Sequence, residues 1–324
     1  MAGNCKRTPL SLAAGKGDEA AVKLLLEQKD VDPNMADARG RTPLSWAASS
    51  GRDGVVKQLL GRKDVNPNLA DNSGQTPVHW ATIRVHYRAL KLLLECGDVN
   101  PNVTDNQGKT PLFCAAERRR YQAAWLLLER EDIAPNIANI AGYTPLMIAV
   151  KRMSHRLVKL ILRRGDVNPN IADKFHYTPL HCAALLGDDE GVKLLLERAD
   201  ITPGIPNDFG QTPLTGAASH GHDGVVELLL GWQNSDPNIT DKDGRTPLSW
   251  AAESGHYRVV QLLLARQDVN PSIPDNGGRT PLWWATFSGS AGNVELLQAA
   301  ISGNPIEVWL PHNKISTTDL KNQI

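Results

Sequence analysis

Apolar residues recur along the chain in short groups at helical spacing, and polar stretches rich in Gly, Pro and Asn separate the groups. In one unit, the apolar positions are Leu44, Ala47, Ala48, Val56, Leu59 and Leu60. Their i, i+3, i+4 spacing predicts two short helices, and Gly51 falls between them. The polar connector 64–68 then contains Pro67, which cannot continue a helix. The pattern therefore predicts a helix–turn–helix unit followed by a connector.

This unit repeats at a constant interval. Thr-Pro pairs begin at residues 8, 42, 76, 110, 144, 178, 212, 246 and 280, which places nine copies 34 residues apart. Gly40 can supply the positive φ of a tight turn, Thr42 can cap the next helix, and Pro43 suits the first helical position. One copy cannot bury its apolar face alone, whereas stacked copies bury a continuous core. We therefore expect an all-α solenoid.

The sixth copy carries a specific resemblance. Its Thr-Pro-Leu-His-Cys-Ala-Ala stretch, residues 178–184, is nearly the Thr-Pro-Leu-His-x-Ala-Ala signature of the ankyrin repeat. The resemblance covers about residues 3–300, and the repeated Thr-Pro-Leu-Ser-Trp-Ala-Ala wording is similar to ankyrin arrays of filamentous fungi. Tetratricopeptide repeats also have a 34-residue period, but they lack the Gly-x-Thr-Pro turn. The resemblance implies an ankyrin-repeat solenoid of about nine helix–turn–helix repeats with protruding turns.

The repeats set the expected domain boundaries. We expect residues 1–302 to form the solenoid, with its first and last repeats as caps, and residues 303–324 to form a C-terminal capping tail. Ile306, Val308, Trp309 and Leu310 are the tail residues expected to fold back over the last helices. The chain could also be a piece of a larger receptor, because fungal-type arrays often follow other domains.

Charge and cysteine content narrow the class of partner. Lys and Arg number 35, as do Asp and Glu, so the balance predicts no general attraction for nucleic acid or a membrane surface. The four cysteines show no metal or disulfide spacing, and no long apolar run is present. We expect a monomer in the cytoplasm or nucleus, with no cofactor and no metal.

The ankyrin resemblance implies a partner in the concave groove, which the turn tips and the exposed side of the first helices line. Repeats 3–7 depart from the consensus sequence of the repeats at the tips of the turns. There Ile140, Tyr143, Phe175, Tyr177 and Phe209 replace polar residues. Exposed aromatic side chains are typical of binding sites. The alternative is that neighbouring tips pack on one another.

Other departures lie beside these tips. His176 occupies a turn position that is glycine in seven of the other eight copies, which indicates either a strained positive φ or a differently shaped turn. Met147 replaces the usual Ser or His of the first helix. The residues two positions beyond each Ala-Ala pair, or its Ala-Val equivalent in repeat 5, are Arg118, Arg152, Leu186 and His220. They suggest a basic flank at repeats 4–5 beside an apolar centre at repeats 5–7, although a solvated charged face explains the arginines equally well.

Gly216 follows the usual Ser or His position of its repeat, and the other copies have larger side chains at the equivalent position, which we call a column. The equivalent residue of the preceding repeat, Cys182, is also small. Either an adjacent side chain fills this space, or a small-molecule pocket opens between Tyr177, His181, Gly216 and His220. Cys114 and Cys182 share the column and are expected to be buried thiols.

Two functions follow as hypotheses. The first is a protein-binding module that uses the groove of repeats 3–7. The alternative is a small-molecule binder, or an unusual metal-free enzyme, that uses the pocket at Gly216 with His181 or His220 as general acid or base and takes a small apolar ligand.

Overall fold

The computed structural model describes residues 7–232, 235–303, 307–310 and 313–316, and the chain divides into two compact units, Met1–Val167 and Asn168–Ile324. The first unit contains α1 (Pro9–Lys16), α2 (Glu19–Leu26), α3 (Pro43–Ser49), α4 (Asp53–Leu60), α5 (Pro77–Arg84), α6 (Tyr87–Glu95), α7 (Pro111–Glu117), α8 (Tyr121–Leu128), α9 (Pro145–Lys151) and α10 (His155–Leu162). The second unit contains α11 (Pro179–Leu186), α12 (Asp189–Leu196), α13 (Pro213–His220), α14 (Asp223–Leu230), α15 (Pro247–Glu253), α16 (Tyr257–Ala265), α17 (Pro281–Phe287), α18 (Ala291–Ile301), β1 (Glu307–Leu310) and β2 (Asn313–Ser316).

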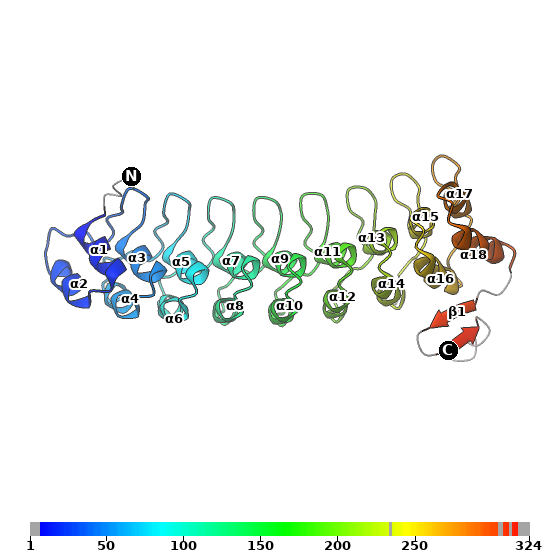
Figure 1. The fold of residues 1–324 in the computed structure, drawn as a ribbon. Helices are drawn as coiled ribbons and strands as arrows, with labels where there is room; N and C mark the ends of the chain where they lie inside the picture. Colours follow the sequence, from blue (N-terminus) through cyan, green and yellow to red (C-terminus); the bar gives the residue numbers. More distant parts are fainter. Residues whose placement is uncertain (1–6, 233–234, 304–306, 311–312, 317–324) are drawn as a thin grey trace. The chain divides into compact units, whose positions relative to one another are not determined.

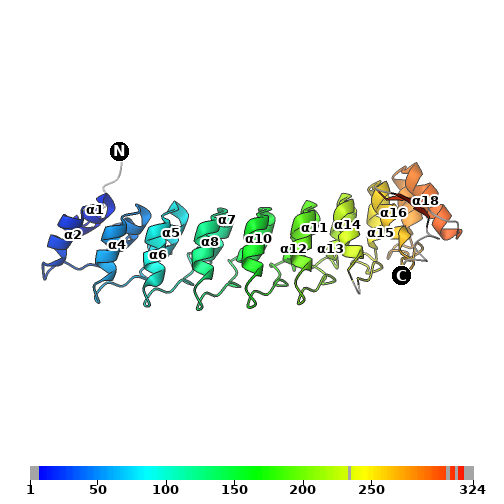
Figure 2. The same cartoon turned by 90° about the horizontal axis from the view of Figure 1, so that it is seen from below.

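Each repeat is a pair of helices, and the pairs stack in chain order within each unit. The first helices pack on one another, as α3 does on α1 and α5, and the second helices do the same, as α14 does on α12 and α16. Long loops project beyond the first helices of each unit (Figure 1). We call the part of each loop that leads into a first helix, for example residues 69–76 before α5, a finger. Seen from below, the second helices of each unit lie side by side in front of the first helices of the same unit (Figure 2). The helix pairs confirm the predicted all-α repeat architecture.

The local sequence explains where each helix begins and ends. In repeat 2, the Thr42 hydroxyl accepts the backbone N–H of Ser45 at 3.2 Å, and Pro43 is the first residue of α3. Gly51 adopts φ 63° between the two helices of the repeat. The apolar face of α4 is fully buried at Val55, Val56 and Leu59. These features confirm the predicted cap, helix start and turn.

The tail adds a small β element to this helical fold. Strands β1 and β2 pair antiparallel, with Val308 opposite Ile315 and Trp309 opposite Lys314. β1 contacts α16, while Ile306, which the sequence analysis placed in the capping tail, lies outside the described residues.

Polar side chains of the connectors join most repeats to the next. The Asn68 amide donates to the carbonyl of Asp98 at 2.7 Å, and its oxygen accepts the N–H of Asn100 at 2.7 Å. Arg130 forms a two-pronged ion pair with Asp132 and also donates to the carbonyl of Leu94 at 2.6 Å, where α6 is ending. The bonds to Asp98, Asn100 and Leu94 therefore satisfy backbone groups that the neighbouring repeat would leave without an internal partner.

The fingers are joined in a similar way. In repeat 2, the Asp37 carboxylate accepts the N–H groups of Arg39 and Arg41 within the finger, and the Arg39 carbonyl accepts the N–H of Asn72 from the next finger at 3.0 Å. The other carboxylate oxygen of Asp37 accepts the indole N–H of Trp46 at 3.0 Å. A finger is thus held both to its own helix and to its neighbour.

The finger glycines provide a test of this packing. Gly74 and Gly278 have nearly the same φ, 78° and 76°. A Cβ atom added at Gly74 would lie 2.6 Å from the backbone nitrogen of Asn106, whereas a Cβ atom added at Gly278 would have no neighbouring atom within 4 Å. We expect Gly74→Ala to lower the free energy of unfolding by about 1–3 kcal/mol more than Gly278→Ala, because both pay the left-handed backbone cost and only Gly74→Ala forces the fingers apart. Urea denaturation of the two variants measures this difference, and equal losses would show that the close finger contact is unimportant.

Candidate functional site

The most exposed aromatic side chains of the candidate groove are at two neighbouring finger tips in the second unit. Phe175 is 61% exposed and Phe209 is 55% exposed. Asn207 shapes the second finger, because its side-chain oxygen accepts the N–H groups of Phe209 and Gln211, both at 2.9 Å. More than half of each phenylalanine remains in contact with solvent, so packing between neighbouring fingers does not bury the two rings.

Backbone hydrogen bonds hold these two fingers in register. The Phe175 carbonyl accepts the N–H of Asp208 at 3.1 Å, and the Phe209 carbonyl accepts the N–H of Lys242 at 2.9 Å. The phenylalanines are therefore presented on backbone that is fixed before any partner arrives, which reduces the entropy lost on binding.

His176 has the strained conformation that was one of its two sequence interpretations. Its φ is 60°, in the left-handed region where most copies have glycine. The imidazole Nδ1 lies 2.7 Å from a carboxylate oxygen of Asp208, and both side chains are well exposed. His176 thus adds a side-chain contact between the two phenylalanine fingers.

The first-helix residues divide into exposed and buried sets. Leu186 and His220 are exposed at the ends of α11 and α13, and Tyr177 is half-buried with its ring edge-on to His181 at 5.6 Å. Met147, His181 and Gly216 are buried and cannot touch a partner.

His181 is 2% exposed, and both of its ring nitrogens are occupied. Nδ1 accepts the N–H of Thr178 at 3.1 Å, so Nε2 carries the proton that is donated to the Gln211 carbonyl at 3.0 Å. Burial lowers the pKa of His181 and outweighs the hydrogen bond to Gln211, which acts in the opposite direction. This histidine therefore links two repeats as a neutral side chain.

The space around Gly216 is filled. A Cβ at Gly216 would lie 3.1 Å from Cδ2 of Leu185, a residue of the preceding repeat. His220 bonds back into its own helix, with Nδ1 3.0 Å from the Gly216 carbonyl, and stacks on His222 at 5.9 Å. Of the two interpretations of Gly216, the geometry supports the filled core.

In the first unit, Ile140 lies at a finger tip and is 63% exposed. Tyr143 is half-buried, and the centre of its ring lies 4.2 Å from the Lys151 ammonium group. Arg118 and Arg152 are exposed at the ends of α7 and α9. Neither forms an ion pair with any acidic side chain in the part of the chain that the structure describes.

Charge is segregated along the sequence although the total is zero. Residues 84–164 contain 14 Lys and Arg against seven Asp and Glu, whereas residues 173–253 contain five against 13. The basic flank expected at repeats 4–5 therefore belongs to a wider basic stretch, and potentials of this kind steer charged partners.

Three residues in the basic stretch have a strained backbone that was not predicted from the sequence. Val85, Arg119 and Met153 have φ values of 68°, 55° and 50° at the turn between the two helices, where other repeats place a glycine such as Gly51. The absence of glycine at this position can be read from the sequence and would have predicted the strained backbone. A β-branched valine in this region is a conformational outlier.

The remaining chemistry is limited. Burial raises the pKa of the Cys114 thiol to about 12, which keeps it protonated, and Cys182 is also buried. No group of three His, Cys, Asp or Glu side chains is close enough to hold a metal ion within the described ranges. Among the described helices, none has both the length and the apolar character needed to cross a membrane.

Comparison with known proteins identifies the repeat. A family model described as ankyrin repeats in three copies matches residues 2–71, 52–139, 130–205, 146–240 and 214–306. The chain belongs to the ankyrin-repeat family. Ankyrin-repeat proteins generally mediate protein–protein interaction, and this class of function is the one that the family supports for the chain.

Solved structures of ankyrin-repeat proteins are also similar to the chain. One is the ankyrin repeat domain of Bcl-3, described as a unique member of the IκB protein family, with 28% identity, a TM-score of 0.64, and coverage of 69% of this chain and 99% of that chain. Another is the ankyrin repeat protein EF0377, with 27% identity, a TM-score of 0.55, and coverage of 58% and 96%. A comparison with curated proteins finds no match.

The buried histidines of the ankyrin signature make stability depend on pH. Burial lowers the pKa values of His79 and His181 in the folded chain. In the unfolded chain histidine titrates near 6.5, so below that pH the unfolded chain binds more protons than the folded chain. Stability is fully present above about pH 6.5 and falls as pH drops, by up to about 2 kcal/mol per histidine at pH 5.

We expect His181→Ser, which installs the residue found at Ser45 and Ser249, to reduce the loss of stability between pH 7 and pH 5. Urea denaturation at both pH values measures it, with the exposed His220→Ser as control. An unchanged pH dependence in His181→Ser would contradict the assignment.

Proposed function

We propose that this ankyrin-repeat chain is a protein-binding module whose partner contacts the finger tips and first helices of repeats 3–7. The observation that carries the proposal is the exposure of Phe175 and Phe209 on fingers fixed by backbone hydrogen bonds. Large aromatic side chains held in one position bury much surface at a small entropic cost, and such residues dominate binding energy. Leu186 and His220 are further exposed side chains of the second unit, and Ile140 is an exposed side chain of the first unit within the proposed repeats.

Charge defines the chemistry of the partner further. Arg118 and Arg152 are exposed and have no acidic partner among the described residues, so their guanidinium groups are available to a carboxylate. We therefore infer that the partner segment combines apolar side chains with acidic ones. Because neighbouring fingers are already hydrogen-bonded to each other, the partner binds them without reordering the backbone.

We expect the double variant Phe175→Ser, Phe209→Ser to weaken binding at least tenfold, because the loss of two aromatic anchors costs about 2 kcal/mol or more. Affinity capture with the wild-type chain supplies the partner, and titration calorimetry with the purified partner then measures the dissociation constant.

Phe287→Ser is the matched control, because Phe287 is 68% exposed but lies in repeat 9, outside the proposed surface. It should bind the partner as the wild type does. The proposal fails if the double variant keeps wild-type affinity, or if Phe287→Ser weakens binding as much as the double variant does.

A further inference from the structure

The connector between repeats 6 and 7 interrupts the polar links that join repeats elsewhere. On either side of it the asparagine link is intact. The Asn170 oxygen accepts the N–H of Thr202 at 2.9 Å, and the Asn238 oxygen accepts the N–H of Asn270 at 2.8 Å. Gly204 occupies the same position between them and has no side chain. The N–H of Asp236, which would be its partner, forms no hydrogen bond with another described residue.

Two further substitutions lie in the next connector, between repeats 7 and 8. Elsewhere this position is apolar, and Val99, Ile133 and Ile201 are buried there, whereas repeat 7 has Ser235. The Ser235 hydroxyl is held by the Arg266 guanidinium at 3.1 Å. Trp232 stands where repeats 6 and 8 have an arginine.

The arginine that Trp232 replaces forms an ion pair in each of the flanking repeats. Arg198 and Arg266 each form a two-pronged ion pair with the aspartate two residues later, at 2.5–2.9 Å. Trp232 can make no such pair. The three changes together therefore remove an amide, an apolar branch and a guanidinium from one small region.

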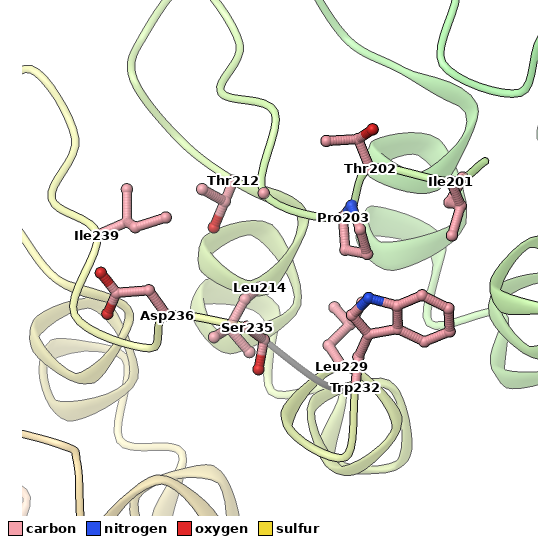
Figure 3. Close-up of a pocket in the computed structure, with 11 residues that line it drawn as sticks. Ile201, Thr202, Pro203, Thr212, Leu214, Leu229, Trp232, Ser235, Asp236 and Ile239 are labelled. Atoms are coloured by element: carbon pink, nitrogen blue, oxygen red, sulfur yellow. The ribbon is translucent and has the colours of Figure 1, made fainter. Parts of the chain in front are cut away.

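A pocket of about 380 Å³ occupies this region (Figure 3). Its apolar wall comes from Leu214 of α13, Leu229 of α14 and Ile239 of the following connector. Trp232 and Pro203 form another side, and both are labelled in the close-up. The volume exceeds twice the ~150 Å³ that accommodates one benzene ring, so a two-ring molecule fits it.

Polar groups of the pocket define the rest of the ligand. One carboxylate oxygen of Asp236 accepts the N–H of Asn238 at 2.8 Å, and the other accepts no hydrogen bond from a described residue. The Asp236 carboxylate can pair with a cation, and the Trp232 indole on the opposite side of the pocket can stack on an aromatic ring (Figure 3).

We propose that this pocket binds a small two-ring aromatic molecule that carries an amine. The ring system contacts Trp232 and the apolar wall, and the ammonium group pairs with Asp236. The site is separate from the phenylalanine fingers and from Gly216, so it adds a ligand-binding activity to the proposed protein-binding module.

Tryptamine, indole and indole-3-acetate test the proposal, because they share one ring system and differ in charge. Titration calorimetry of the full chain should give tryptamine a dissociation constant on the order of 1 mM or below, with indole weaker and indole-3-acetate weakest. The triple variant Gly204→Asn, Trp232→Arg, Ser235→Val restores residue types found in neighbouring repeats, so it should fold well and bind tryptamine at least tenfold more weakly.

Ser272→Asn is the matched control, since Ser272 occupies the same connector position as Gly204 two junctions further along the chain and lies outside the pocket. It should bind tryptamine as the wild type does. Wild-type affinity in the triple variant, no binding of any of the three probes to the wild type, or tighter binding of indole-3-acetate than of tryptamine would overturn the proposal.

Discussion

The supply of hydrogen-bond partners from one repeat to the next is the constraint on which this fold depends. The short helices leave many carbonyl and N–H groups at their ends and in the connectors, and a single repeat has no internal partners for them. Asn68 reaches a carbonyl 30 residues ahead and an N–H 32 residues ahead, and fingers bond at a similar separation. An insertion of one residue would displace these partners. This explains physically why the 34-residue period runs through nine copies without a slip.

The same constraint explains why the proposed functions lie at departures from the repeat. Side chains that satisfy a neighbouring repeat cannot be changed without cost, whereas the exposed side chains of Phe175 and Phe209 take no part in those links and can vary. Their backbone remains bound to the adjoining fingers, so the variable side chains sit on a fixed support. The pocket beside Trp232 arises in the opposite way, because there the links themselves are absent and space opens between two repeats.

The sequence was sufficient for the fold because each local signal agrees with the others. Thr42 caps a helix, Pro43 begins it and the finger glycines adopt positive φ, as their residue types predict. The strained φ of His176 was one of two stated interpretations. Packing was harder to foresee. Gly216 indicates a small side chain, but only the structure shows that Leu185 fills the space above it, and that His181 faces a carbonyl of the next repeat. The pocket depends on three substitutions up to 31 residues apart, none of which is informative alone.

Residue-resolved amide hydrogen exchange tests the central claim most directly. Thr202, Asp236 and Asn270 occupy equivalent connector positions, and the first and last donate their N–H groups to Asn170 and Asn238. If links between repeats protect the connectors, the amide hydrogen of Asp236, which faces Gly204, exchanges at least about tenfold faster than the other two, since a hydrogen-bonded amide must open before it exchanges. Equal protection at all three positions would show that the asparagine links do not hold the connectors, and would contradict this account of the fold and of the pocket.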